Sequence, residues 1–162
     1  MAAQGSILGN AVTRKEDPGL LTGSNHYVDD LDIDAARIVF VRSTMAHASL
    51  LEVDISEAVN MPGVLAVYTS DNLEMPAVNQ SEFMAPSMNR PPLAVGRVRF
   101  VGDIIAAIVA ESHSQAVDAA EQVIVDYDPL PANADIEAAL ADDAHILWEG
   151  AENNVCFAIG NE

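Results

Sequence analysis

The sequence predicts a mixed α/β domain in which short strands are separated by turns and by two or three short helices. Two observations lead to this fold class. Short runs rich in β-branched residues recur along the chain, as they do in buried and half-buried strands. One segment, 112–123, has the apolar spacing of an amphipathic helix. The chain has 162 residues, of which 50% are hydrophobic, and this suits one domain with a buried core and a trailing segment.

The first part of the chain predicts an arm followed by strands. Residues 1–30 contain glycine and proline without sustained periodicity, so we expect an extended arm with turns. The β-branched and aromatic run at 36–42 indicates a buried strand, and the alternation of apolar and acidic residues at 50–55 indicates a strand with one exposed face. Ser56 stands where its hydroxyl could cap a short helix at 57–60.

A long loop is expected in the middle of the chain. A strand at 64–69 ends in a turn, and the prolines and scattered apolar residues of 74–96 indicate an ordered loop without a repeating pattern. Apolar runs at 97–101 and 104–111 then indicate two more strands.

Segment 112–123 gives the clearest helical signal. Ser112 and Gln115 match a capping box at its start. The stripe that would face a sheet consists of Ala116, Ala119, Ala120 and Val123. Because these side chains are mostly small, we expect the helix to pack closely against a sheet. A strand at 123–127 and a last short helix at 136–140 follow.

The charge of the chain excludes several classes of partner. It carries 25 acidic and 7 basic side chains, a formal charge of −18. Such a chain repels phosphate backbones and anionic lipids, so we expect no nucleic-acid and no membrane partner. The acidity serves either solubility or contact with a basic partner domain. We expect no signal peptide or membrane span, and the single cysteine, Cys156, fits a reducing compartment, so the protein is expected to be cytoplasmic.

The sequence lacks the motifs that usually carry catalysis. It has no glycine-rich phosphate loop, and its four histidines are dispersed without metal-ligand spacing. His47 could act as a general base, but a hydrogen-bonded histidine in a packed turn fits its position better. Arg42 is expected to pair with a carboxylate inside the domain, and Cys156 to be an inert thiol. We therefore expect no catalytic, cofactor-binding or metal-binding residue in this chain.

Four sequence blocks occur in a distinctive order. They are Arg14–Gly23 with Tyr27–Asp30; Val41–Ser43 with Ala46–Ala48, continuing to Asp54 and Met61–Val64; Arg97–Gly102 with Ile105–Ala106 and Val109–Glu111; and Ala116–Val123 with Val125–Pro131. Together they resemble the N-terminal domain of the molybdenum-binding large subunit of the molybdenum hydroxylases. This family includes xanthine dehydrogenase, aldehyde oxidase and aerobic carbon monoxide dehydrogenase. Thr44–Met45 and Asp103 depart from the family's usual Pro-His and glutamate, which leaves the subfamily and the substrate open.

The resemblance implies an α/β-hammerhead with a mixed sheet, two or three helices and a long proline-rich loop. It divides the chain into an arm at 1–30, a hammerhead domain at 31–145 and a tail at 146–162 that leads toward a missing cofactor-binding region. The chain alone is then non-catalytic and has a structural or assembly role. No catalytic residue of the family can be placed on it.

The resemblance also implies the chemistry of the complete enzyme. That enzyme would oxidise an aldehyde, a purine-like N-heterocycle or carbon monoxide. Molybdopterin with molybdenum would be held in the rest of the subunit, with iron–sulfur clusters and FAD in partner subunits or domains. A free-standing, non-catalytic binding or interaction module of the same fold is the alternative.

One stretch of the loop has a possible role of its own. In relatives, the corresponding stretch lies near the channel by which substrate reaches the molybdenum. Phe83 and Met84 could therefore line a substrate funnel, or they could fill the domain's own core. We also expect apolar patches that missing neighbours would cover, with the regions around Phe83–Met84 and Trp148 as candidates.

Overall fold

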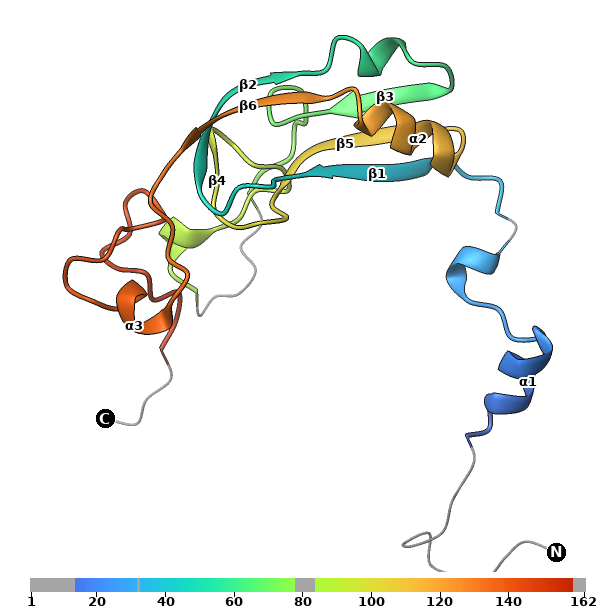
Figure 1. Cartoon of the computed structure of the whole chain (residues 1–162), viewed down its shortest axis with the longest axis horizontal. Coiled ribbons are helices and arrows are strands. Elements are labelled where there is room, and N and C mark those ends of the chain that lie inside the picture. The colour runs from blue at the N-terminus through green and yellow to red at the C-terminus, as the bar shows by residue number, and fades with distance from the viewer. Residues whose placement is uncertain (1–13, 32, 78–83, 159–162) are drawn as a thin grey trace, which may run out of the picture. The chain divides into compact units, whose positions relative to one another are not determined.

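The computed structural model describes residues 14–31, 33–77 and 84–158 (Figure 1). The chain divides into two compact units, Met1–Ala35 and Ala36–Glu162. Among the helices in the described ranges, none combines the length and the apolar composition that a membrane span requires. The boundaries expected at residues 31 and 145 for the hammerhead domain stay a prediction.

The first unit contains a short helix where the sequence predicted an extended arm. Helix α1 spans Asp17–Thr22, with proline in its first turn, and it ends at Gly23, whose φ of 70° is left-handed. A 3-10 turn, η1 (Val28–Asp30), follows, in which the Asp30 carboxylate accepts a hydrogen bond of 2.9 Å from the Tyr27 N–H. A helix of six residues is too short to produce a visible period. Its two terminal signals, proline at the start and glycine after the end, were nevertheless in the sequence.

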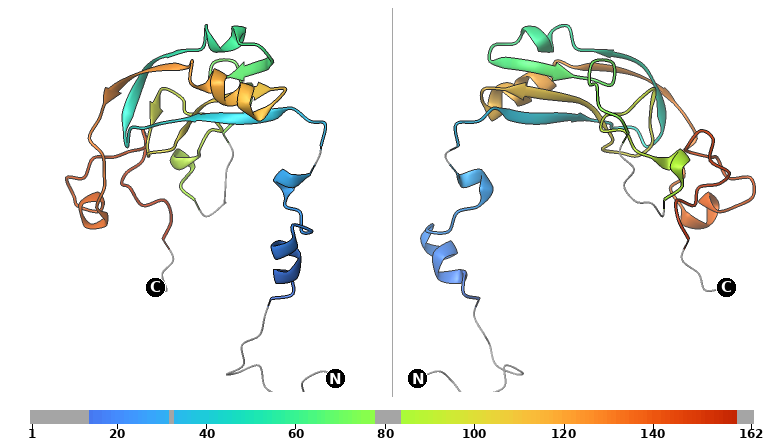
Figure 2. Two further views of the ribbon diagram at one scale, coloured as in Figure 1. Left: turned by 45° about the vertical axis from the view of Figure 1, so that its right-hand side comes forward. Right: turned by 180° about the vertical axis from the view of Figure 1, so that it is seen from behind.

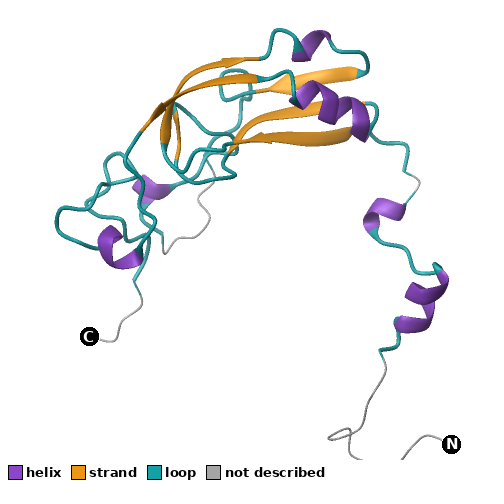
Figure 3. Ribbon diagram, in the orientation of Figure 1, coloured by secondary structure: helices purple, strands orange, loops and turns teal. Residues whose placement is uncertain are grey.

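The second unit contains two three-stranded antiparallel sheets (Figures 1 and 3). The first has the strand order β1–β5–β3, and the second has the order β4–β2–β6. In chain order the strands are β1 (Arg37–Arg42), β2 (Ala48–Asp54), β3 (Val64–Tyr68), β4 (Arg97–Val98), β5 (Ile104–Ala110) and β6 (Ile124–Pro129).

The fold class is confirmed, but the single mixed sheet that we expected is wrong in detail. Helix α2 (His113–Ala120) connects β5 to β6, and these two strands belong to different sheets. If α2 connected two neighbouring strands of one sheet, those strands would be parallel. All pairings among the described strands are instead antiparallel. The order of strands along the sequence does not distinguish these two arrangements.

Helix α2 covers one face of the first sheet and forms a hydrophobic core with it (Figures 1 and 2). Ala116 and Ala119 of the predicted alanine stripe are fully buried there, against Val67 of β3 and Ile108 of β5. The Ser112 hydroxyl accepts a hydrogen bond from the Gln115 N–H, which confirms Ser112 as the cap. The Gln115 side chain accepts a hydrogen bond of 2.7 Å from the Ser112 hydroxyl, in place of the bond from the Ser112 backbone N–H that a full capping box would have. The methyl side chains let the helix axis approach the sheet closely, as the sequence predicted.

A second core lies between the two sheets. Ala48 of β2, Val98 of β4 and Ile105 of β5 are buried in it, together with Ala94. Strand β5 therefore contributes Ile108 to one core and Ile105 to the other. This agrees with the prediction of a central strand that is apolar throughout.

Two of the short predicted elements differ from the structure. Residues 57–60 contain the 3-10 turn η2 (Ala58–Asn60), and no side chain caps it. Instead, the Asp54 carboxylate accepts a hydrogen bond of 2.8 Å from the Ser56 N–H, and this holds the pKa of Asp54 below its usual range. The strand predicted at 97–101 is reduced to Arg97–Val98 because the chain turns at Gly102, where φ is 92°.

Two further predicted elements are present. The last helix, α3, spans Ile136–Ala139, and Asp135 caps it by accepting a hydrogen bond of 2.8 Å from the Ala138 N–H. In the described parts of the expected loop, 74–77 and 84–96, the one helical turn is η3 (Pro86–Met88).

The packing of α2 predicts the effect of a larger side chain. Ala119→Phe should lower the free energy of unfolding by about 1–3 kcal/mol, because overpacking forces the helix away from the sheet. The half-buried Ala120 should tolerate the same change better. Urea unfolding of the 162-residue chain measures both. Asp118→Phe, on the exposed side of the same helix, is the matched control, and equal unfolding midpoints for the Ala119 and Asp118 variants would contradict the packing.

Candidate functional site

The tail that follows α3 is folded back on the domain through one asparagine. Asn154 accepts a hydrogen bond of 3.0 Å from the Leu147 N–H, and its amide nitrogen donates to the carbonyl oxygens of His145 and Ala139 at 2.9 and 3.1 Å. Farther along, the Ala85 N–H donates to the Cys156 carbonyl oxygen at 2.9 Å. The tail is therefore bound both to itself and to the second half of the proline-rich loop.

Arg97 of β4 and Arg99, which directly follows this strand, hold the next part of the tail. Arg97 and Arg99 are two residues apart, so their side chains point to the same face of the extended chain. The Arg99 guanidinium lies 4.2 Å from the ring centroid of Trp148, and its Nε donates to the Leu147 carbonyl oxygen at 3.1 Å. Arg97 forms an ion pair with Glu149. Trp148 is half-buried, and the apolar patch expected in its region stays a prediction.

The environment of Arg99 is set by burial and by neighbouring charges. Burial lowers the pKa of its guanidinium, and the positive charge of Arg97 adds to this effect. The carboxylates of Asp103 and Glu149 act in the opposite direction. An arginine side chain stays protonated at neutral pH even with such a shift, so a cation is retained over the indole ring.

Asp103 connects these arginines to the turn before β5. It is mostly buried, and its Oδ2 accepts a hydrogen bond of 3.2 Å from the Arg99 N–H. Its Oδ1 lies 3.6 Å from Nη2 of Arg90, whose guanidinium also lies 4.5 Å from the ring of Phe100. The aspartate that departs from the family's usual glutamate thus has a clear structural partner on each oxygen.

A hollow of about 300 Å³ lies between the loop and the tail. Ala85, Ser87 and Met88 line it from the loop, and Gly150–Asn153 with Val155 line it from the tail. Met84 precedes these loop residues and is half-buried, whereas Phe83 lies outside the described residues. Neither residue is among those that line this hollow, and the funnel role of both stays a prediction.

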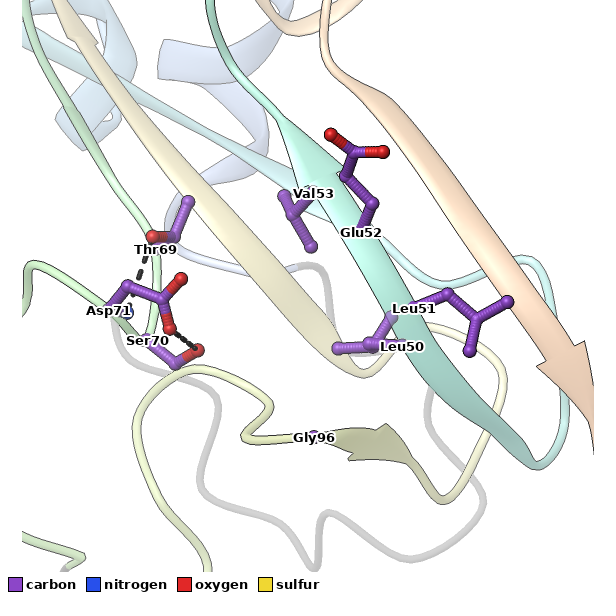
Figure 4. A pocket seen from close by; sticks show the side chains of 8 residues that line it. All are labelled: Leu50, Leu51, Glu52, Val53, Thr69, Ser70, Asp71 and Gly96. Atoms are coloured by element: carbon purple, nitrogen blue, oxygen red, sulfur yellow. Dashed lines mark hydrogen bonds between the residues drawn. The ribbon is translucent and has the colours of Figure 1, made fainter.

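A second hollow of similar volume, about 300 Å³, lies between β2 and the turn after β3 (Figure 4). The turn contributes Thr69, Ser70 and Asp71. These side chains satisfy one another, because the Ser70 hydroxyl donates to Asp71 at 3.4 Å and the Asp71 N–H donates to the Thr69 hydroxyl at 3.3 Å. The lining includes no histidine, lysine or cysteine, so it has no nucleophile paired with a general base of the usual kind.

His47 lies in the packed turn between β1 and β2, as the sequence predicted. Its side chain is 2% exposed, and Nδ1 donates to the Pro131 carbonyl oxygen at 2.7 Å. The ring of His145 lies 5.2 Å away, centroid to centroid, at 53°. This arrangement ties the chain after β6 to the turn before β2 and favours a structural role.

The structure differs from the prediction for Arg42 and agrees with part of the prediction for Cys156. Within the described ranges Arg42 has no carboxylate partner, contrary to our expectation, and donates to the Gly102 carbonyl oxygen at 3.0 Å. Cys156 is half-buried as expected, and its reactivity stays a prediction.

Potential metal ligands do not cluster in the part of the chain that the structure describes. The described residues contain no group of three or more His, Cys, Asp or Glu side chains that could hold a metal ion.

Sequence reasoning missed the contacts that organise the tail. The Arg-Val-Arg pattern at 97–99 could have indicated two cations on one face of a strand. Nothing in the sequence indicated that Trp148, Glu149 and Asn154 would be their partners or hold the tail in place.

Comparison with known proteins assigns the two-sheet arrangement to a class. A family model described as "Aldehyde oxidase and xanthine dehydrogenase, a/b hammerhead domain" matches residues 22–131. The fold is thus an α/β-hammerhead, as the resemblance implied. Since the match covers more than half of the 162 residues, the chain belongs to this aldehyde oxidase and xanthine dehydrogenase family.

Individual relatives are much longer than this chain. The gamma subunit of the 6-hydroxypseudooxynicotine dehydrogenase complex of Paenarthrobacter nicotinovorans is 37% identical over 142 residues, which cover 82% of this chain and 18% of the relative. The carbon monoxide dehydrogenase large chain of Afipia carboxidovorans is 35% identical, with coverages of 91% and 18%. The solved structure of the aldehyde oxidoreductase from Desulfovibrio gigas has a TM-score of 0.72 and 31% identity, with coverages of 89% and 17%. The chain spans less than a fifth of the length of these relatives.

The contact between Arg99 and Trp148 predicts a spectroscopic change. Arg99→Ala should loosen the tail and cost about 0.5–2 kcal/mol of local stability, because it removes a partly desolvated cation–π contact. Trp148 is the only tryptophan, so its fluorescence should shift to the red and be quenched more strongly by acrylamide. Arg37→Ala, in β1, is the control with an expected unchanged emission. Identical quenching of the wild type and the Arg99 variant would show that the contact does not hold the tail.

Proposed function

We propose that this chain is the structural and assembly domain of the molybdopterin-binding large subunit of a molybdenum hydroxylase. The observation that carries this proposal is the family match over residues 22–131 in a chain that spans less than a fifth of its relatives. In this proposal the domain supports the regions that hold the cofactor.

The proposal extends to the reaction of the complete enzyme. Its substrate would be an aldehyde, an N-heterocycle or carbon monoxide, classes that occur in the names of relatives such as an aldehyde oxidoreductase, a quinoline oxidoreductase and a carbon monoxide dehydrogenase. Molybdenum chemistry would take place in the rest of the subunit, and iron–sulfur and flavin partners would carry the electrons away. The protein's part is to orient the cofactor and substrate.

The cellular location forms part of the same proposal. We place the complete enzyme in the cytoplasm, which a chain with one cysteine fits because its fold needs no disulfide.

The length of the natural reading frame tests this assignment directly. A frame that continues for several hundred residues into a glycine-rich pterin-binding region is the expected result. A stop codon directly after Glu162, with no separate gene for the remainder nearby, would favour a free-standing interaction module.

Cofactor content gives a biochemical test. After desalting, the purified 162-residue chain should carry no stoichiometric molybdenum, iron or flavin, whereas the complete subunit with its partners should carry them. Elemental analysis and the flavin absorption spectrum measure both preparations. Stoichiometric metal in the short chain would contradict a purely structural role.

The funnel hypothesis predicts a kinetic signature in the complete enzyme. Phe83→Ala and Met84→Ala should change kcat/KM to an extent that depends on substrate size and leave the unfolding midpoint nearly intact, because the side chains would contact substrate on its way in. Kinetics with a small and a bulky substrate measure the effect.

Ile108→Ala is the matched control for these variants. Ile108 is fully buried beneath α2, away from the loop, and its truncation should instead cost about 2–5 kcal/mol of stability without a change in selectivity. The same behaviour of the Phe83 and Met84 variants would mean that both residues fill the core.

A further inference from the structure

The face of the first sheet that points away from α2 is apolar. We call this surface the outer face and define it by Ile38 and Phe40 of β1, Ala66 and Tyr68 of β3, and Ala107 and Val109 of β5. Of the elements that the structure describes, α2 is the helix that packs on all three strands, and it lies on their other face (Figures 1 and 2).

The strand register places these six side chains in two rows. Phe40 and Tyr68 both pair with Ala107, so the three form one row across the sheet. Ile38 and Ala66 both pair with Val109 and form the second row. Side chains alternate between the two faces of a strand, and the intervening Val39, Val67 and Ile108 pack in the core beneath α2.

The outer face is apolar in a strongly acidic chain. Ile38, Phe40 and Tyr68 are 52%, 38% and 37% exposed. None of the six residues is charged, although the chain has 25 acidic side chains. Between them, Ala107 is 6% exposed, and Ala66 and Val109 are half-buried. Single exposed apolar residues are ordinary, whereas three of them around small apolar side chains of one sheet face indicate a contact surface.

Arg42 adds a positive group beside this surface. It follows Phe40 by two residues on β1, and its guanidinium lies 5.4 Å from the Phe40 ring centroid. The same side chain donates to the Gly102 carbonyl oxygen, which fixes its position. A matching surface would be apolar at its centre and would present a carboxylate or carbonyl oxygen near Arg42.

We propose that the outer face is the docking surface for another domain of the same large subunit. This inference rests on the proposed function. The small share of its relatives' length that this chain covers supports it. The chain covers 18% of the carbon monoxide dehydrogenase large chain, so most of that relative's polypeptide has no counterpart here and is available as a neighbour. A second copy is a poorer occupant, because two chains of formal charge −18 repel each other.

Hydroxyl-radical labelling read by mass spectrometry tests the proposal. Phe40 and Tyr68 should react readily in the 162-residue chain and become several-fold less reactive in the complete subunit. Phe100 is the matched control, since it is 39% exposed and lies on the turn before β5. Equal protection of Phe100 would indicate general shielding by a larger protein and would count against docking at this face.

Other results separate the possible failures. Unchanged reactivity of Phe40 and Tyr68 in a subunit that contains molybdenum would overturn the docking surface and leave the proposed function intact. Protection that appears in the 162-residue chain as its concentration rises would instead identify a second copy as the occupant, and so also overturn the proposal.

Substitution of an outer-face residue gives an independent measurement. Ile38→Ser should leave the unfolding midpoint of the 162-residue chain unchanged and lower the yield of assembled, molybdenum-loaded subunit several-fold. Leu51→Ser, at a 63% exposed position of β2 in the other sheet, should leave the yield unchanged. An equal loss of yield for both variants, or destabilisation of the short chain by Ile38→Ser, would contradict a docking role.

Discussion

Strand β5 is the element on which the rest of the second unit depends. It pairs with β1 on one side and β3 on the other, and its side chains enter two different cores. Ile108 packs beneath α2, whereas Ile105 packs against the second sheet. A polar residue at either position would disturb the packing of one core. Because both residues lie on β5, a displacement of this strand would also affect the other core. This double burial explains why β5 is apolar throughout its length.

The sequence predicted those elements whose signals are local. The Ser112 cap, the alanine stripe of α2 and the apolar run of β5 each lie within one short segment, and all three were confirmed. The split into two sheets could not be predicted in this way, because it depends on which strands pair across long separations. The same distinction applies to the site. The position of His47 in a packed turn was predicted from neighbouring residues, whereas the contact of Trp148 with Arg99 could not be predicted because it depends on how the tail folds.

The polar contacts around β4 explain how an irregular tail keeps a defined position. Arg99 and Asn154 form hydrogen bonds with backbone groups of the tail, and the Asp103 carboxylate accepts one from the Arg99 N–H. Such hydrogen bonds are directional and need both partners. In the core beneath α2, by contrast, an apolar side chain of suitable shape and size is enough for packing. The loop and the tail therefore form one structural region, and the hollow between them lies in that region.

The distribution of charge connects the fold with the proposed role. An acidic surface keeps a protein soluble, and a uniform acidic surface would also repel an acidic neighbour from the same polypeptide. The six residues that define the outer face include no acidic side chain, and the cation of Arg42 lies beside Phe40. A strand that only had to cover this domain's own core would tolerate polar residues at Ile38, Phe40 and Tyr68, since one-sided sheets usually alternate in that way. Apolar residues at these exposed positions are therefore better explained by contact with a neighbouring domain than by the stability of the isolated unit.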